Sequence, residues 1–244
     1  MTKTLVLIPS RMAATRLPGK PLLRIDNLSI IFHVYKRAVE ANIGEVVVAT
    51  EDQEILDDVL KNGGKGILTR SDHKTGTDRI FEAYKKLNIK DIDYVLNLQG
   101  DEPDINKDDI SSLNNFMISH SPDIGTLAAT IKNDKMLADN NIVKVVTESK
   151  LEKNNFPSAL NFTRHDLSKT NKNIYHHIGI YSYKVSALEK FVILSQTKNE
   201  IENKLEQLRA LDNKLKINVA LAKSSPIGVD SKEDYLAIKK IMEY

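Results

Sequence analysis

Residues 7–22 read LIPSRMAATRLPGKPL, and this stretch decides the fold class predicted for the chain. Residues 4–8, TLVLI, form a short apolar run rich in β-favouring side chains, which is typical of a strand buried on both faces of a parallel sheet. Pro9 has no backbone N–H, so we expect the strand to end there. The residues that follow would lie at the carboxyl end of a strand, where open α/β sheets bind their ligands.

The segment after this strand is a loop of small side chains interrupted by cations. The cations are Arg11, Arg16 and Lys20. Arginine binds phosphate oxygens with two donors and lysine adds a point charge, so the loop suits a triphosphate. Its spacing matches neither the GxxxxGK[ST] loop nor the GxGxxG turn and therefore indicates a different mode of nucleotide binding. The alternative is a solvated basic loop.

Helix and strand patterns alternate through the first half of the chain. Helices are predicted over 30–42, 53–61 and 76–87, and strands over 45–50, 66–69 and 93–98. This alternation predicts an α/β fold, with a mostly parallel sheet and helices on both faces.

The middle of the chain has strand patterns without intervening helices. They occupy 123–131, 142–147, 158–163 and 175–183. We expect a small antiparallel element over approximately 125–185, used for sugar binding or dimer contacts. Helices over 186–194, 200–211 and 231–244 and a strand over 217–222 complete the prediction.

Composition limits the possible classes of protein. The 244 residues suffice for a single domain over 1–244. With 35 basic and 33 acidic residues the net charge is +2, too weak to indicate a nucleic-acid or anionic-membrane partner. The absence of cysteine excludes disulfides, thiolate catalysis and Cys-based zinc sites. No stretch approaches the roughly 20 apolar residues of a membrane span, so we expect a soluble cytoplasmic protein.

Two further segments carry polar groups that suit a nucleotide. Residues 97–103, NLQGDEP, end a strand with Asp101 and Glu102, an acidic pair of the kind that holds Mg²⁺; alternatively, these acids are solvated in a turn. In residues 69–79, TRSDHKTGTDR, Gly76 permits close approach to a base, and Thr75 or Arg70 can donate hydrogen bonds. Alternatively, Asp72 or Thr75 caps the next helix.

The remaining polar residues are ambiguous when taken one at a time. His176 and His177 are adjacent on a strand, so they point to opposite faces. Glu206, Gln207 and Arg209 are predicted to form the exposed charged face of a helix whose leucines are buried. Asp230 by itself indicates a helix cap.

Taken together, these motifs resemble the 3-deoxy-D-manno-octulosonate (Kdo) cytidylyltransferases, or CMP-Kdo synthetases. The resemblance runs in order through IPSRMAATRLPGKPL, TRSDHKTGTDR, NLQGDEP, NIVKVV, HIGIYSY, LEQLRAL and GVDSKEDY. It implies a Rossmann-like nucleotide-diphospho-sugar transferase fold, a homodimer, and the reaction CTP + Kdo → CMP-Kdo + pyrophosphate with Mg²⁺, in lipopolysaccharide biosynthesis. Two alternatives stay open: a cytidylyltransferase for another 2-keto sugar acid such as sialic acid, and a non-catalytic nucleotide-binding protein.

The resemblance also implies a role for each matching residue. Arg11 and Lys20 would hold the triphosphate and, with Asp101, form the catalytic group. Arg70, Thr75 and Gly76 would line the cytosine and ribose pocket, and Asp101 and Asp230 would bind the metal. The residues expected around the sugar acid are Arg16, Gln99, Arg164, His177, Tyr181, Glu206 and Gln207.

Overall fold

The computed structural model describes residues 2–13, 16–169 and 173–243. The chain forms two compact units, the first made of Met1–Ser111 with Pro226–Tyr244 and the second of Ser112–Ser225. Helix α4 (Lys107–His120) begins in the first unit and ends in the second.

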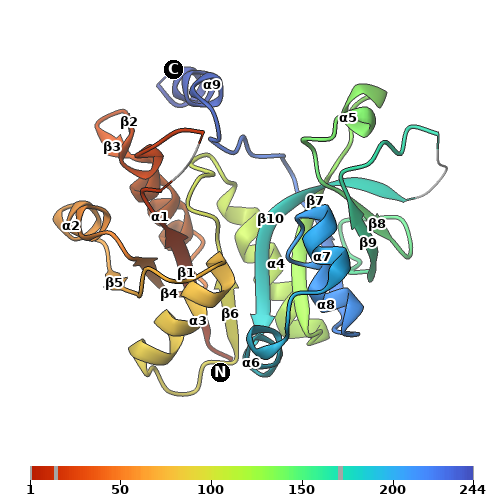
Figure 1. The fold of residues 1–244 in the computed structure, drawn as a ribbon, viewed down its shortest axis with the longest axis horizontal. Coiled ribbons are helices and arrows are strands. Elements are labelled where there is room, and N and C mark those ends of the chain that lie inside the picture. Colours follow the sequence, from red (N-terminus) through yellow and green to blue (C-terminus); the bar gives the residue numbers. More distant parts are fainter. Residues whose placement is uncertain (1, 14–15, 170–172, 244) are drawn as a thin grey trace. The chain divides into compact units, whose positions relative to one another are not determined.

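The first unit is built on a parallel sheet with strand order β5-β4-β1-β6. Strands and helices alternate along the chain, as predicted. Crossovers between parallel strands are right-handed, so α1 and α2 lie on one face of this sheet and α3 on the other (Figure 1). The elements are β1 (Thr4–Ser10), α1 (Ile30–Glu40), β4 (Gly44–Thr50), α2 (Gln53–Lys61), β5 (Gly66–Leu68), α3 (Gly76–Leu87) and β6 (Tyr94–Asn97).

Strand β1 continues past Pro9, so the prediction that proline ends it is wrong. Pro9 is in register with Ala49 of β4, and the strand ends at Ser10. The Pro9 carbonyl points away from β4, toward the side on which β6 has already ended and Gly100 lies close. A missing N–H on that side breaks no bond to β4, because alternate residues of a parallel strand bond to opposite neighbours.

A small hairpin and the last helix complete the first unit. The hairpin joins β2 (Arg24–Ile25) to β3 (Leu28–Ser29) and follows a 3₁₀ turn, η1 (Lys20–Leu22). Helix α9 (Lys232–Met242) packs against it through a buried apolar cluster that contains Ile25, Val229 and Ile238. This contact fixes where the segment before α9 runs, including Asp230.

The second unit has a mixed sheet, and its antiparallel strand pairs lie in the region 125–185, where an antiparallel element was predicted. Strand β10 is antiparallel to both β7 and β8, β8 is antiparallel to β9, and β11 is parallel to β7. The elements are β7 (Ile124–Thr130), α5 (Asp134–Ala138), β8 (Lys144–Thr147), β9 (Ala159–Thr163), β10 (Ile174–Lys184), α6 (Val185–Ile193), α7 (Lys198–Asn203), α8 (Leu208–Asp212) and β11 (Ile217–Leu221).

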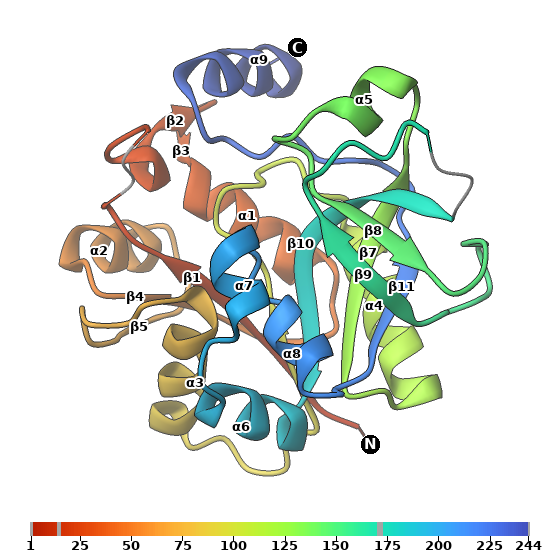
Figure 2. The same ribbon diagram turned by 45° about the vertical axis from the view of Figure 1, so that its right-hand side comes forward.

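Several helical predictions need correction, and the five-residue helix α5 was not predicted. The single helix predicted over 200–211 is two short helices, α7 and α8, because Lys204 adopts a left-handed conformation with φ 53° (Figure 2). Helix α4 was not predicted, although Ile110, Leu113 and Met117 have helical spacing and are fully buried. Among the described helices, none is long and apolar enough to cross a lipid bilayer.

The exposed charged face predicted around Arg209 is also wrong, because Arg209 and Gln207 are buried. The Arg209 guanidinium donates from Nε and Nη2 to both carboxylate oxygens of Glu200, at 2.8 and 2.6 Å. Its carbon Cζ also lies 4.7 Å from the ring centroid of Phe191. The ion pair therefore joins α7 to α8 inside the unit, and the break at Lys204 lets the two helices fold against each other.

Removing one partner of this pair should destabilise the protein strongly. We expect Arg209→Met to lower the free energy of unfolding by about 3–5 kcal/mol, because Glu200 would stay buried without its partner. Lys198→Met, which removes the exposed Lys198–Glu202 pair of α7 with its 3.7 Å contact, should change it by less than about 1 kcal/mol. Urea unfolding of both variants measures the difference, and equal effects would contradict this account.

Candidate active site

The first unit contains a cavity of about 360 Å³ at the carboxyl ends of its strands. Its walls come from the loop after β1, the segment leading into α3, the loop after β6 and Asp230. The chain order of the sheet reverses between β1 and β6, because β4 and β5 lie on one side of β1 and β6 on the other. Open α/β folds bind their ligands at this switch point.

The Lys20 ammonium forms the centre of one wall. Its Nζ donates to Asp101 Oδ2 at 2.8 Å, to Asp230 Oδ1 at 3.1 Å and to the carbonyl of Val229 at 2.7 Å. Burial alone would lower the pKa of Lys20, but the carboxylates of Asp101 and Asp230 outweigh it and raise that pKa. Lys20 is therefore a fixed positive charge at neutral pH.

Backbone contacts place these groups together. Gly19, immediately before Lys20, has a φ of 71°, a left-handed conformation that suits glycine. The Val229 N–H donates to the Asp101 carbonyl at 2.9 Å and joins the segment before α9 to the loop after β6. The β1 loop is held by Asp52, whose Oδ2 accepts the Met12 N–H at 2.8 Å.

Acidic groups outnumber the cations around Lys20. Glu102 Oε2 is buried and has no hydrogen-bond partner among the described residues. Burial, followed by the negative charges of Asp101, Asp104 and Asp230, raises the pKa of Glu102 to about 8. Arg16 adds one compensating contact, from Nη2 to Asp230 Oδ2 at 2.9 Å, but both side chains are exposed. A cation placed beside Glu102 would favour the ionised form of its carboxyl group.

The oxygens around Lys20 fit a divalent cation. Asp101, Asp230 and the Val229 carbonyl converge on a single ammonium, and hard cations take such oxygen ligands. Magnesium is typically held by one or two carboxylates together with substrate phosphates and water. Asp101 and Asp230 are the residues that could hold it. In the described part of the chain, no three His, Cys, Asp or Glu side chains are grouped to bind a metal ion.

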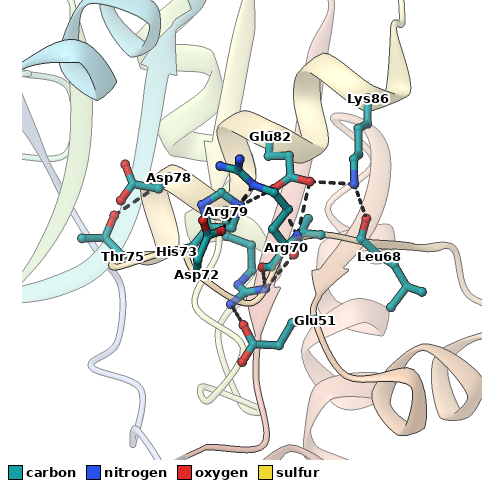
Figure 3. Close-up of polar contacts among 11 residues, drawn as sticks. Glu51, Leu68, Arg70, Asp72, His73, Thr75, Asp78, Arg79, Glu82 and Lys86 are labelled. Atoms are coloured by element: carbon teal, nitrogen blue, oxygen red, sulfur yellow. Dashed lines mark hydrogen bonds and ion pairs between the residues drawn. The ribbon is translucent and has the colours of Figure 1, made fainter.

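The loop between β5 and α3 is anchored by Glu82 of α3 (Figure 3). The Arg70 N–H donates to the Glu82 carboxylate at 3.2 Å, and Lys86 Nζ lies 2.6 Å from Oε1. The His73 ring also contacts Oε2. Burial opposes ionisation of Glu82, but the hydrogen bonds from Lys86, His73 and Arg70 outweigh it and hold its pKa at about 2.

A second set of contacts fixes the start of α3. Arg79 is buried, pairs with Glu51 and donates to Thr69 Oγ1 at 2.6 Å (Figure 3). Thr75 caps α3 by accepting the Asp78 N–H at 3.1 Å, as one of the two sequence hypotheses stated. A Cβ on Gly76 would lie only 3.3 Å from Pro9 Cγ, so glycine lets α3 begin close to β1.

Most residues predicted for the nucleotide, the metal and part of the sugar site line this one cavity. They are Arg11, Arg16, Lys20, Thr75, Gly76, Gln99, Asp101 and Asp230. Arg70 is not among the lining residues; its Nε lies 3.3 Å from Asp72 and 3.6 Å from Glu82. Sequence reasoning assigned no role to His73, Lys74 and Arg79, which also line the cavity. Their position within 69–79 was the available signal.

The other predicted sugar contacts belong to the second unit. His177 is buried, 5.4 Å from Tyr181 and 5.0 Å from Phe162 between ring centroids. Burial, followed by the charges of Tyr183 and Glu206, raises the pKa of Tyr181 well above its usual value. Gln207 follows Glu206 and forms the N-cap of α8.

Arg164 extends this group of residues. Its Nη1 donates to the Asn141 carbonyl at 3.0 Å, and its own carbonyl accepts from the buried Lys144 at 2.9 Å. His176 faces a different partner from His177, with Nδ1 2.8 Å from Ser225 Oγ, as the alternation on a strand predicts.

This fold and cavity define a nucleotidyltransferase of the Rossmann-like class. A family model described as cytidylyltransferase matches residues 5–217. The chain is 44% identical to a 3-deoxy-manno-octulosonate cytidylyltransferase of Rhodopseudomonas palustris, over 100% of this chain and 99% of that protein. It is 43% identical to one of Nitrobacter hamburgensis, over 99% and 93%. The chain therefore belongs to the 3-deoxy-manno-octulosonate cytidylyltransferase family.

Solved structures agree with this assignment. A CMP:2-keto-3-deoxy-manno-octonic acid synthetase complexed with CTP superimposes with a TM-score of 0.89 and 33% identity, covering 99% of this chain and 98% of that one. A UDP-glucose pyrophosphorylase complexed with UDP-glucose has a TM-score of 0.72 at 15% identity, over 99% and 98%, which shows a shared fold. The predicted Rossmann-like nucleotidyltransferase fold is confirmed.

The low pKa of Glu82 predicts a pH-dependent contribution to stability. The folded-state pKa of about 2 lies below the usual 4.5, so the contribution is complete above pH 4.5 and is lost as the pH falls toward 2. The difference in the free energy of unfolding between wild type and Glu82→Gln should be constant near neutral pH and shrink below about pH 4.5. Urea titrations between about pH 7 and 3.5 measure it, and a constant difference throughout would show that the assigned pKa is wrong.

Proposed function

We propose that this protein catalyses CTP + Kdo → CMP-Kdo + pyrophosphate, with Mg²⁺, and so activates Kdo for lipopolysaccharide biosynthesis. The observation that carries the proposal is the cavity of the first unit, where Lys20 lies between Asp101 and Asp230 at the switch point of the sheet. The full-length similarity to 3-deoxy-manno-octulosonate cytidylyltransferases supports the choice of both substrates.

In this reaction the 2-hydroxyl of Kdo attacks the α-phosphorus of CTP, and pyrophosphate leaves along the opposite direction. Such a transfer depends on alignment and on neutralisation of phosphate charge. Lys20 is a fixed cation on the cavity wall, and Arg11 is exposed on the same wall with its guanidinium available to a phosphate. We assign both to the triphosphate.

Asp101 and Asp230 would hold Mg²⁺. When bound, the ion supplies positive charge to the phosphate oxygens and lowers the pKa of an attacking hydroxyl. Because Lys20 already contacts both carboxylates, these acids are held in place before the substrate arrives. Neither unit supplies a residue that we assign as the general base.

We assign base and ribose recognition to the segment that leads into α3. Thr75 and Gly76 line the cavity, and the Glu82 carboxylate holds the preceding loop through Arg70 and His73. Arg70 lies outside the cavity wall, so its assigned contact with the nucleotide would require a change in its pairing with Asp72 and Glu82.

We assign recognition of the sugar acid to the residues that match the sugar-binding positions of the family. In the first unit these are Arg16 and Gln99, and in the second they are Arg164, His177, Tyr181, Glu206 and Gln207. A guanidinium paired with the sugar carboxylate would select an acid sugar over a neutral one. Homodimer formation and a cytoplasmic location stay predictions from the family resemblance.

Pyrophosphate release from CTP and Mg²⁺ tests the proposed function. We expect release with Kdo and none with sialic acid or without a sugar acid. Release with sialic acid instead would identify a cytidylyltransferase for a different 2-keto sugar acid. No pyrophosphate release in any of the three reactions, together with normal CTP binding by calorimetry, would favour a non-catalytic nucleotide-binding protein.

Changes at the two carboxylates test the metal assignment. Asp101→Asn and Asp230→Asn should each lower kcat by about 100-fold or more, because a metal contributes several kcal/mol to charge stabilisation in the transition state. Asp57→Asn, which changes an acid of α2 that accepts from Gln53 at 2.7 Å, should leave the rate unchanged. Near wild-type activity in either site variant, with the melting temperature preserved, would refute the assignment.

A further inference from the structure

The side chain of Thr126 has an unusual set of neighbours inside the second unit. Thr126 lies on β7, is fully buried and is paired with Tyr181 of β10. Between Ile178 and Tyr181 the register of β10 shifts against β7. A register shift of this kind inserts extra backbone into one strand and redirects its carbonyl groups. Here two of those carbonyls point at the Thr126 hydroxyl.

Three groups lie within hydrogen-bonding distance of this hydroxyl. Thr126 Oγ1 lies 2.7 Å from the Ile180 carbonyl, 3.3 Å from the Ile178 carbonyl and 3.1 Å from His177 Nε2. A hydroxyl has a single hydrogen to donate, and a carbonyl oxygen can only accept. At 2.7 Å the distance to Ile180 is the usual length of an O–H···O bond, so the hydrogen of Thr126 belongs there.

This contact determines which nitrogen of His177 carries hydrogen. With its own hydrogen directed at a carbonyl, Thr126 Oγ1 can only accept from Nε2, so Nε2 must be protonated. Burial, followed by the charges of His176 and Arg164, lowers the pKa of His177 to about 3, which keeps the ring neutral near pH 7. A neutral imidazole with hydrogen on Nε2 has an acceptor lone pair on Nδ1.

The surroundings keep the ring in this orientation. Phe162 contacts His177 edge-on, with ring planes 81° apart, and the backbone N–H of His177 donates to the Val143 carbonyl at 2.9 Å. Within the described residues we find no hydrogen-bond partner for Nδ1. An oriented acceptor of this kind suits a ligand that offers a hydrogen-bond donor.

We propose that Thr126 is a positioning residue that holds His177 in the Nε2–H form, so that Nδ1 accepts a hydrogen bond from a hydroxyl group of the sugar acid. The inference rests on the proposed function for the identity of the ligand, but the contact between Thr126 and His177 does not. The two residues would therefore recognise different groups of the sugar acid. The Arg164 guanidinium has only donors, which suit a carboxylate, whereas the His177 ring has an acceptor, which suits a hydroxyl.

Nuclear magnetic resonance tests the tautomer directly in the full-length wild-type protein. With ¹⁵N-labelled histidine, the His177 signals are assigned by their loss in His177→Gln. We expect Nε2 to have the shift of a protonated nitrogen and Nδ1 that of an unprotonated one at pH 7. Hydrogen on Nδ1 would overturn the inference, even if turnover with Kdo were normal.

A matched pair of substitutions tests the functional part. Thr126→Val keeps the branched shape but removes the acceptor, so both tautomers should become populated and kcat/KM for Kdo should fall about tenfold, with KM for CTP unchanged. Thr126→Ser keeps the hydroxyl and should restore both the tautomer and the kinetics. A mixed tautomer with unchanged kcat/KM for Kdo would overturn the role in recognition.

The two readouts separate this inference from the proposed function. If the wild-type protein did not turn over Kdo, the proposed function would fail, while the resonance experiment would still decide the role of Thr126. If Thr126→Val did not fold, as a melting curve would show, the wild-type spectrum would decide the tautomer. Thr126→Ser would then decide the kinetics, because a loss of kcat/KM for Kdo despite a retained tautomer would contradict the role.

Discussion

The ammonium of Lys20 is the interaction on which the site of the first unit depends. It bonds to Asp101 and Asp230, which lie 81 and 210 residues further along the chain, and to the carbonyl of Val229. Without this charge, the acids after β6 and before α9 would repel each other at short range. One cation therefore holds together the loop after β1, the loop after β6 and the segment before α9.

The same charges prepare the site for a polyanionic substrate and its metal. Several acids lie near Lys20, and burial, followed by the charges of the neighbouring carboxylates, raises the pKa of Glu102. Two cations, Arg11 and Arg16, are exposed at the same cavity. The second unit differs in chemistry, since His177 and Tyr181, two of its predicted sugar contacts, lie against other aromatic rings, and a neutral histidine and an un-ionised tyrosine are favoured there.

Sequence patterns predicted the first unit closely because its elements are local. The boundaries of α2 and α3 match the prediction, since amphipathic spacing, together with the glycines that follow α2 and the Thr75 cap of α3, specifies such helices within one segment. The patterns failed where contacts between residues far apart in the sequence determine burial or the end of a strand. Arg209 has the spacing of an exposed residue, but Glu200 and Phe191 bury it. Pro9 stays within a strand because the neighbouring strand has already ended.

By itself, the sequence determined the α/β class, the alternation of strands and helices between β1 and β6 and the motifs that place this chain in its family, because these features depend on local periodicity and on residue types. Only the tertiary structure decided that Lys20 joins Asp101 to Asp230, that Glu82 anchors the loop before α3 and that Thr126 orients His177. Each of these contacts depends on the distance and direction between atoms of different elements. Packing of the chain sets those quantities, and no local pattern encodes them.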